Sequence, residues 1–300
     1  MKKIYLVSIL LGIGLWLCAG VHDNAGSYGF KFLQNPTNPI SLSLAGRGTG
    51  VYNNPAGFVH QPASQVHYRH SVVSASHTLW LADTKFTNVS YSLANRSSHF
   101  GIIMRNLDYG EVENRDDSGE LIGFYSPVDM NLMANYALRL NPSSYFGVNA
   151  GILYEKLNTA SAFGMNCDLG YTYLPPILDS RMSFAIRNLG FTSKMNRERI
   201  DLPVTLELEL NKGFSFDNAK LSLGAFGIKA DDEDVKGAFF GELEVSEIFA
   251  IRAGYKLNYA AEDITAGFGV KVLGIGIDYG WASYNSQLDD VHSLGISYSF

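Results

Sequence analysis

The chain has 300 residues, 46% of them hydrophobic, and a formal net charge of −6 at pH 7. This acidic balance, without a cluster of Lys and Arg, argues against nucleic-acid binding. The composition excludes neither a soluble protein nor a membrane barrel, because only alternate residues of a barrel strand face lipid.

Residues 1–20 have the pattern of a secretory signal peptide. Two lysines precede an apolar run at 4–16, and small residues follow it. The run is too short for a membrane-spanning helix, so the sequence predicts export and cleavage. Cys18 could carry a lipid anchor, but Leu17 is not the small residue that normally precedes a lipidated cysteine. Cleavage would leave Cys167 as the single cysteine, and so no internal disulfide is expected.

Residues 21–61 are rich in Gly, Asn and Pro and show no sustained period. They contain Arg47 between two glycines and the motif Asn54, Pro55, Ala56 and Gly57. Pro fixes φ, Gly permits a positive φ and Asn can cap the bend. The motif is therefore either a plain tight turn before the first strand or an anchor for a plug in the lumen of a barrel.

From residue 64 onward, side chains alternate between apolar and small or polar in about fourteen segments. A strand sends successive side chains to opposite faces, so each segment is predicted to be a strand with one apolar face. The segments that begin at Ala219 and Lys236 alternate poorly. The predicted strands begin near Ser64, Lys85, Ser98, Val128, Ser144, Ala160, Arg181, Pro203, Ala219, Lys236, Ile248, Asp263, Gly274 and Asp290.

The last two segments show the pattern most clearly. In 275–282 large apolar residues alternate with Gly, Asp and Ala, and in 293–300 they alternate with Ser and Gly. The chain stops on an aromatic residue, with Tyr298 and Phe300 on the apolar face. Such a terminal strand is typical of outer-membrane barrels, whose apolar face meets lipid. By resemblance to such barrels, Tyr298 and Phe300 are expected to form the signal read by the barrel-assembly machinery.

The connections support the same architecture. The longer or more acidic ones, 107–127, 190–202, 230–235 and 284–289, all follow odd-numbered strands. Outer-membrane barrels have an even number of strands, short periplasmic turns and longer external loops. A secreted β-sandwich shares the alternation, but its exposed faces would carry more charge. We therefore predict an all-β transmembrane antiparallel β-barrel of about fourteen strands over 62–300, with 21–61 as an N-terminal lumenal plug.

Several motifs resemble the PorV/PorQ family of outer-membrane proteins, relatives of the FadL-type barrels. They are Phe30-Lys31-Phe32-Leu33, Ser43–Gly48, Asn53–Phe58, Leu107-Asp108-Tyr109-Gly110 and Asp117-Ser118-Gly119-Glu120 with Gly123-Phe124. The resemblance covers about residues 25–300. It implies a non-enzymatic outer-membrane component of type IX protein secretion, whose partners are exported proteins or other secretion components. The segment between the glycine turn and Asn54 is shorter here than in the family.

No catalytic or metal-binding pattern emerges. The sequence has no nucleophile elbow, no His-Glu-x-x-His and no Cys-x-x-Cys. His67 and His70 are expected on opposite faces of one strand, which is poor geometry for a metal. We predict a protein that is not an enzyme and needs no cofactor or metal, and whose partners are outer-membrane lipid and the assembly machinery.

Charged residues occupy the inferred inner face. They form either a network that fills a closed barrel or the lining of a path or plug-docking surface. The acidic loop Glu111–Glu120 is either a solvated loop or a docking surface. The inner-face residues are Arg69, Arg105, Arg139, Arg187, Arg252 and Lys256, with Asp168, Glu207, Glu209, Glu242 and Asp278.

Two functions follow from this fold in the outer membrane of a Gram-negative-type bacterium. The main interpretation, which rests on the resemblance, is a scaffold in protein secretion or surface attachment. The alternative is FadL-like uptake of hydrophobic small molecules past the plug. An apolar lumenal pocket would favour uptake, whereas a docking scaffold needs only a filled lumen.

Overall fold

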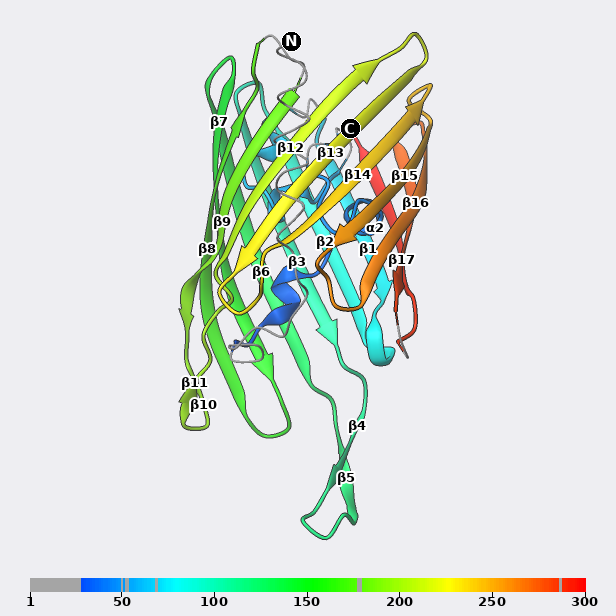
Figure 1. The fold of residues 1–300 in the computed structure, drawn as a ribbon. Helices are drawn as coiled ribbons and strands as arrows, with labels where there is room; N and C mark the ends of the chain where they lie inside the picture. The colour runs from blue at the N-terminus through cyan, green and yellow to red at the C-terminus, as the bar shows by residue number, and fades with distance from the viewer. Residues whose placement is uncertain (1–27, 50, 52–53, 68–69, 177–179, 286–287) are drawn as a thin grey trace.

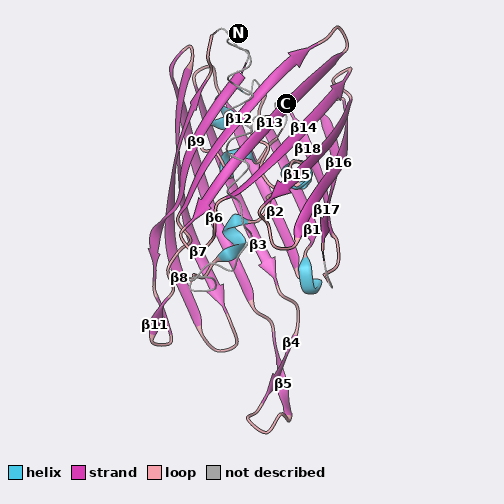
Figure 2. Ribbon diagram, in the orientation of Figure 1, coloured by secondary structure: helices cyan, strands magenta, loops and turns pink. Residues whose placement is uncertain are grey.

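The computed structural model describes residues 28–49, 51, 54–67, 70–176, 180–285 and 288–300. The predicted signal peptide, Cys18 and Arg69 lie outside these residues. Fourteen strands pair antiparallel with their neighbours, and β1 pairs with β18 to close the ring (Figures 1 and 2). The predicted all-β closed barrel of about fourteen antiparallel strands is confirmed.

The barrel strands are β1 (Val72–Leu79), β2 (Lys85–Ala94), β3 (Ser98–Asp108), β6 (Val128–Asn141), β7 (Ser144–Lys156), β8 (Ser161–Tyr173), β9 (Ser180–Thr192), β12 (Thr205–Ser215), β13 (Ala219–Ala230), β14 (Lys236–Val245), β15 (Phe249–Leu257), β16 (Glu262–Val272), β17 (Ile275–Tyr284) and β18 (Val291–Ser299). Two connections carry short hairpins, β4 (Val112–Arg115) with β5 (Leu121–Tyr125) and β10 (Lys194–Met195) with β11 (Glu198–Arg199). The helical turns are η1 (Lys31–Gln34), α2 (Pro39–Ser43), η2 (Gly57–Val59), η3 (Ser64–His67) and η4 (Leu81–Asp83). Within the described residues, no helix has the length and apolar character needed to cross a membrane.

The long and short connections lie at opposite ends of the barrel, because consecutive strands run in opposite directions. We call the end with the long connections, including both hairpins, the loop end. The turn end carries the short connections, such as 142–143 and 273–274, together with the start of β1 and the end of β18. In Figure 1 the loop end is at the bottom and the β4–β5 hairpin projects beyond it.

The two faces of the wall differ as the alternation predicts. Outward residues are apolar and exposed; Phe163, Ile251 and Ile296 are 62%, 63% and 55% exposed. Inward residues of β3, β6, β7 and β8 are buried, and most are small or polar; the apolar exceptions include Ile103, Met133 and Leu153. In β6 and β7, Asn135 donates to Asn149 at 2.7 Å. A wall that is apolar outside and polar inside, and that leaves no sheet edge unpaired, is the arrangement that a bilayer requires.

One predicted strand began in the wrong place. Residues Ser64–His67 form the turn η3, and β1 begins only at Val72. Ser64, Gln65 and Val66 are buried beneath the wall rather than within it. The expectation that His67 and His70 share a strand was therefore also wrong, since both precede β1.

The poor alternation of β13 and β14 has a physical cause. Their inward residues Phe226, Ile228 and Phe240 are apolar because they pack against residues of the N-terminal segment, including Ile40 and Leu44. Both faces of these strands are therefore apolar, and the period of two is lost from the sequence.

A bulge interrupts the pairing of β8 with β9. The register shifts between Cys167 and Leu169, opposite Asn188, whose φ is 60°. The Asp168 carboxylate accepts the Asn188 backbone N–H at 2.8 Å and replaces the lost strand pairing.

The described N-terminal residues 28–67 lie inside the barrel. Tyr28 bridges to Asp201 in the β9–β12 connection at the loop end, and the segment then runs to the turn end, where β1 starts. Its apolar side chains are buried against the wall: Phe32 and Leu33 near the loop end, and Phe58 and Val59 against inward residues of β3 and β6. Burial of this kind stabilises by roughly 1.5–3 kcal/mol for each large side chain.

The facing of β18 generates a prediction. Ile296→Arg should destabilise the inserted barrel by about 2–4 kcal/mol, because the new charge faces lipid. Ser297→Arg is the control, since Ser297 faces a cavity of about 70 Å³ inside the barrel. The free energy of unfolding in lipid vesicles measures both. Equal losses for the two variants would contradict the assigned facing.

Candidate functional site

The barrel interior is filled by an irregular segment whose backbone carbonyls need donors. Inward side chains of the wall supply them. Asn149 Nδ2 donates to the Phe58 carbonyl at 2.9 Å, and Asn135 Nδ2 donates to the Pro62 carbonyl at 3.0 Å. On β2, the Ser92 hydroxyl donates to the Pro55 carbonyl at 3.2 Å. Such bonds satisfy buried backbone groups that no secondary structure satisfies.

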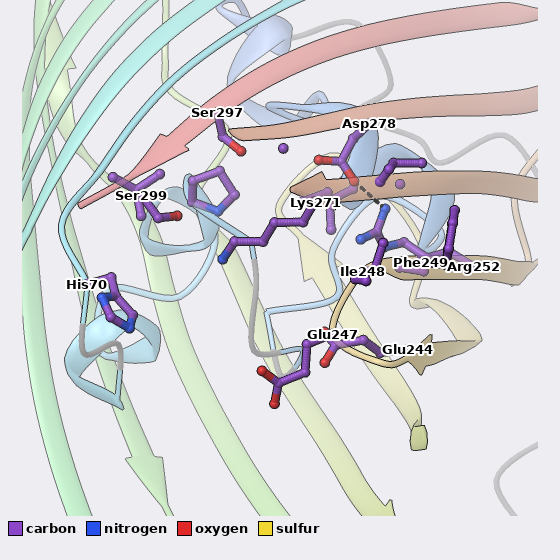
Figure 3. A pocket seen from close by; sticks show the side chains of 17 residues that line it. His70, Glu244, Glu247, Ile248, Phe249, Arg252, Lys271, Asp278, Ser297 and Ser299 are labelled. Carbon is purple, nitrogen blue, oxygen red and sulfur yellow. Dashed lines mark hydrogen bonds and ion pairs between the residues drawn. The ribbon is translucent and has the colours of Figure 1, made fainter. Parts of the chain in front are cut away.

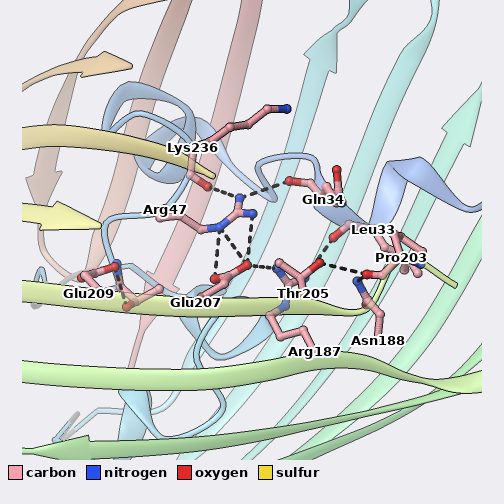
Figure 4. Close-up of polar contacts among 12 residues, drawn as sticks. Leu33, Gln34, Arg47, Arg187, Asn188, Pro203, Thr205, Glu207, Glu209 and Lys236 are labelled. Carbon is pink, nitrogen blue, oxygen red and sulfur yellow. Dashed lines mark hydrogen bonds and ion pairs between the residues drawn. The ribbon is translucent and has the colours of Figure 1, made fainter. Parts of the chain in front are cut away.

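The turn after α2 positions Arg47. Asn38 caps α2, accepting the Ser41 backbone N–H at 2.8 Å, and the helix ends at Leu44. Ala45 and Gly46 then adopt φ values of 58° and 97°, which reverse the chain. Arg47, the next residue, is buried and points toward β12 (Figure 4).

Arg47 forms a buried ion pair with Glu207 of β12. Its Nε lies 3.2 Å from both carboxylate oxygens, and its Nη2 lies 3.1 Å from Oε1 (Figure 4). Arg187 of β9 reaches the same oxygen with Nη1 at 2.6 Å. One carboxylate therefore holds two guanidinium groups, one from the N-terminal segment and one from the wall.

Arg105 lies on the facing side of the lumen. Its Nη1 donates to the Leu33 carbonyl at 3.4 Å, and Arg187 Nη2 donates to the same carbonyl at 2.9 Å. Asn131 Oδ1 accepts two further bonds from Arg105, at 2.7 and 3.1 Å. Arg105, Arg187 and Glu207, three of the predicted inner-face residues, thus meet around Leu33 and Arg47.

Asp278 belongs to a separate cluster nearer the turn end. Arg252 joins two carboxylates there: its Nη1 lies 2.7 Å from Asp278 (Figure 3), and its Nε lies 2.6 Å from Glu242. The cluster borders a cavity of about 70 Å³, which Ser297 and Lys271 also line. This volume holds only a few water molecules.

The motif at 54–57 is a buried turn. Asn54 Oδ1 accepts the Ala56 backbone N–H at 3.3 Å and the Asn38 side chain at 2.7 Å. The expected positive φ at Gly57 is absent. Space is tight there, because an added Cβ would lie 3.1 Å from Gln65 Nε2 and would push that side chain by a few tenths of an ångström. The turn therefore joins α2 to the wall-facing segment that follows it.

The predicted C-terminal residues lie where the ring closes. Phe300 exchanges two backbone hydrogen bonds with Ser71, at 2.9 and 3.1 Å. Its ring stacks on Tyr298, with centroids 6.0 Å apart, and on Tyr91 of β2, with centroids 6.5 Å apart. These contacts tie the last strand to the two strands beyond the closure.

A cavity of about 370 Å³ opens at the loop end, between the N-terminal segment, three connections and the adjoining strand ends. Its apolar side is formed by Trp80, Leu81 and Tyr284, and the two aromatic rings meet edge to face with centroids 6.4 Å apart. The volume is in the range of small-molecule binding sites. The cavity is lined by Lys31, Gln34, Asn35, Pro36, Ala45, Gly46, Arg47, Trp80, Leu81, Ile228, Glu233, Lys236, Lys256, Tyr259, Glu262 and Tyr284.

The opposite side of the cavity is cationic. The ammonium groups of Lys236 and Lys256 each lie 4.9 Å from the centre of the Tyr259 ring. Lys236 also pairs with Glu233 at 2.8 Å, and Lys256 pairs with Glu262. Burial raises the pKa of Tyr259 to about 12, so its hydroxyl is neutral at physiological pH. The pKa of Glu233 is lowered: burial raises it, but Lys236 and Lys31 outweigh burial.

Sequence reasoning missed this cavity. Trp80, Tyr259 and Tyr284 come from three different connections or strand ends, and only the closed ring brings them together. No local signal marked them, because the aromatic girdles of a barrel also place such residues near the ends of strands.

The described residues contain no group of three or more His, Cys, Asp and Glu that could hold a metal ion. Asp168, another inner-face residue, accepts a hydrogen bond from Asn149 at 2.9 Å and a second one from the Asn188 backbone N–H at the bulge in β9.

Comparison with known proteins gives the fold. No family model and no curated protein matches the chain. Among solved structures, the CymD monoaromatic hydrocarbon channel is 11% identical, with 91% of this chain and 99% of that chain covered and a TM-score of 0.66. The Pseudomonas putida toluene transporter TodX is 10% identical, with 88% and 98% covered and a TM-score of 0.66. A Pseudomonas aeruginosa FadL homologue is 11% identical, with 87% and 98% covered and a TM-score of 0.57. The chain thus has the fold of the FadL-like outer-membrane barrels, and the PorV/PorQ resemblance stays a prediction.

The shared carboxylate generates a prediction. Glu207→Leu should lower the free energy of unfolding by about 3–5 kcal/mol, because it leaves Arg47 and Arg187 buried without their anion. It should also expose residues 28–49 to protease in the folded barrel.

The matched control is Glu113→Gln in the β4–β5 hairpin, where the pair with Arg115 is exposed and should contribute at most about 1 kcal/mol. Chemical unfolding in vesicles and limited proteolysis measure the two effects. A Glu207→Leu protein as stable as the control would show that this cluster does not hold the segment.

Proposed function

We propose that the chain is a non-enzymatic outer-membrane channel for small, largely apolar organic molecules. The observation that carries the proposal is the cavity of about 370 Å³ at the loop end, with Trp80, Leu81 and Tyr284 on one side. Its position between the connections and the N-terminal segment is that of a first binding site on a path through the barrel. A cavity with an apolar side and a few polar groups is the usual form of a small-molecule site.

The fold supports the same proposal. The similar solved structures include a monoaromatic hydrocarbon channel and a toluene transporter. Uptake of hydrophobic molecules was the alternative interpretation of the sequence, and it is better supported than the main one. No finding supports a role in protein secretion.

The N-terminal segment acts in this proposal as a plug. Residues 28–67 fill the lumen, held by Arg47 and by wall side chains that donate to their carbonyls. A molecule bound in the loop-end cavity contacts plug residues 34–36 and 45–47 directly. Passage beyond the cavity requires this part of the plug to move, whereas the wall can stay closed.

Uptake is the direct test. Cells that express the protein should take up labelled toluene, 3-phenylpropan-1-ol or 3-phenylpropionate faster than cells without it, once fractionation has placed the protein in the outer membrane. Replacing Trp80 and Tyr284 by Ala should slow this uptake about tenfold or more, because each lost ring removes roughly 1.5–3 kcal/mol of apolar contact. The control Tyr136→Ala removes an outward ring that is 55% exposed. Uptake of none of the three compounds above background would overturn the proposal.

Removing the plug is a second test. A variant that lacks residues 28–49 should still insert as a barrel, because Glu207 stays paired with Arg187 on the neighbouring strand. It should admit small polar solutes, because a fourteen-stranded ring is wide enough to hold water once it is emptied. Swelling of liposomes in arabinose measures this permeability. No gain over the full-length protein would show that the segment does not block the lumen.

A further inference from the structure

The loop-end cavity is unusually rich in hydrogen-bond donors. Four cationic side chains line it, and each has a carboxylate partner: Lys31 pairs with Asp232, Arg47 with Glu207, Lys236 with Glu233 and Lys256 with Glu262. Each lysine ammonium has three N–H donors. The Lys236 ammonium donates one hydrogen bond, to Glu233, and the Lys256 ammonium donates one, to Glu262. The cavity therefore offers N–H donors in excess of acceptors.

A buried amide adds to this excess. Gln34, on the plug side of the cavity, has its Nε2 atom buried and without a hydrogen-bond partner among the described residues. The carbonyl of the preceding residue, Leu33, already accepts hydrogen bonds from Arg105 and Arg187. A buried donor without a partner is costly, and a ligand oxygen placed beside it would remove that cost.

The cavity is divided into two sides. Trp80, Leu81 and Tyr284 belong to an apolar cluster with Leu42, whereas Lys236 and Lys256 converge over Tyr259. A pure hydrocarbon that filled the cavity would strip water from the two ammonium groups and give no hydrogen bond in return. A molecule with an apolar body and a carboxylate head satisfies both sides at once, because a carboxylate only accepts hydrogen bonds and carries the opposite charge.

We infer that this cavity selects small amphipathic carboxylic acids, with the carboxylate held by Lys236, Lys256 and Gln34 and an aromatic or short alkyl body against Trp80 and Tyr284. The inference rests on the proposed channel function and names its substrate class. A volume of about 370 Å³ limits the ligand to about a dozen non-hydrogen atoms, taking about 30 Å³ for each water-sized group.

The test compares 3-phenylpropionate with 3-phenylpropan-1-ol, which has the same skeleton without the charge. Calorimetric titration of the purified full-length barrel in detergent at pH 7.5 and low salt should give an affinity at least tenfold higher for the acid. In a Trp281→Phe background, fluorescence of Trp80 should report the same binding and localise it.

Two variants test the head-group contacts. Lys236→Met should weaken binding of the acid about tenfold, and Lys256→Met combined with Glu262→Gln should do the same without leaving a carboxylate unpaired. Binding of the alcohol should change less than twofold in both. The matched control is Lys220→Met, which removes an exposed lysine that pairs with Glu247 at the turn end. It should change neither affinity.

The outcomes separate this inference from the proposed function. Equal affinity for acid and alcohol, or equal effects of the lysine variants on both, would overturn the carboxylate selectivity and leave an apolar channel in place. Binding of neither compound, together with no uptake by cells, would overturn both proposals. A selective loss of acid binding in the lysine variants would support the substrate class.

Discussion

The requirement that governs this molecule is that no backbone polar group can be left unpaired away from water. In the wall, the pairing of β1 with β18 meets this requirement, because it leaves no strand edge unpaired. Closure also creates an interior. The irregular N-terminal segment occupies this interior and cannot pair all of its own backbone carbonyls. Inward Asn, Ser and Arg side chains supply the missing donors, for example to the carbonyls of Leu33, Phe58 and Pro62. The polar inner face is therefore a set of partners for another part of the same chain.

The central charges follow from the same requirement. Arg187 and Arg105 both reach the Leu33 carbonyl, and the burial of Arg187 then requires an anion. Glu207 supplies it and holds Arg47 as well, so one carboxylate links two strands to the plug. The loop-end cavity shares Arg47 with this network. Arg47 therefore joins the lining of this cavity to the ion pair with Glu207 at the centre of the lumen.

The wall could be predicted from the sequence because lipid and lumen impose opposite demands on alternate residues, as in Ile277 and Asp278 of β17. Prediction failed where that contrast is missing. Phe226 and Phe240 face the plug, so their strands are apolar on both faces. Ser64 begins a buried turn with strand-like composition. The inner charges could be assigned to a face, but their partners could not, because Arg47 and Glu207 lie 160 residues apart. The cavity depends on three separate connections and has no local pattern.

The path of the plug sets the order in which the chain can reach this structure. Tyr28 contacts Asp201 at the loop end, while β1 leaves from the turn end, so the first described residues thread the whole ring. Their partners follow them in the chain, on early strands such as β2, β3 and β7 and on late ones such as β12. Contacts this distant in sequence form slowly, because a long loop must close before any of them contributes. The leading segment can therefore complete its contacts only once the last strands are in place, since Leu42 packs against Ala282 and Tyr284 of β17 and Val291 of β18.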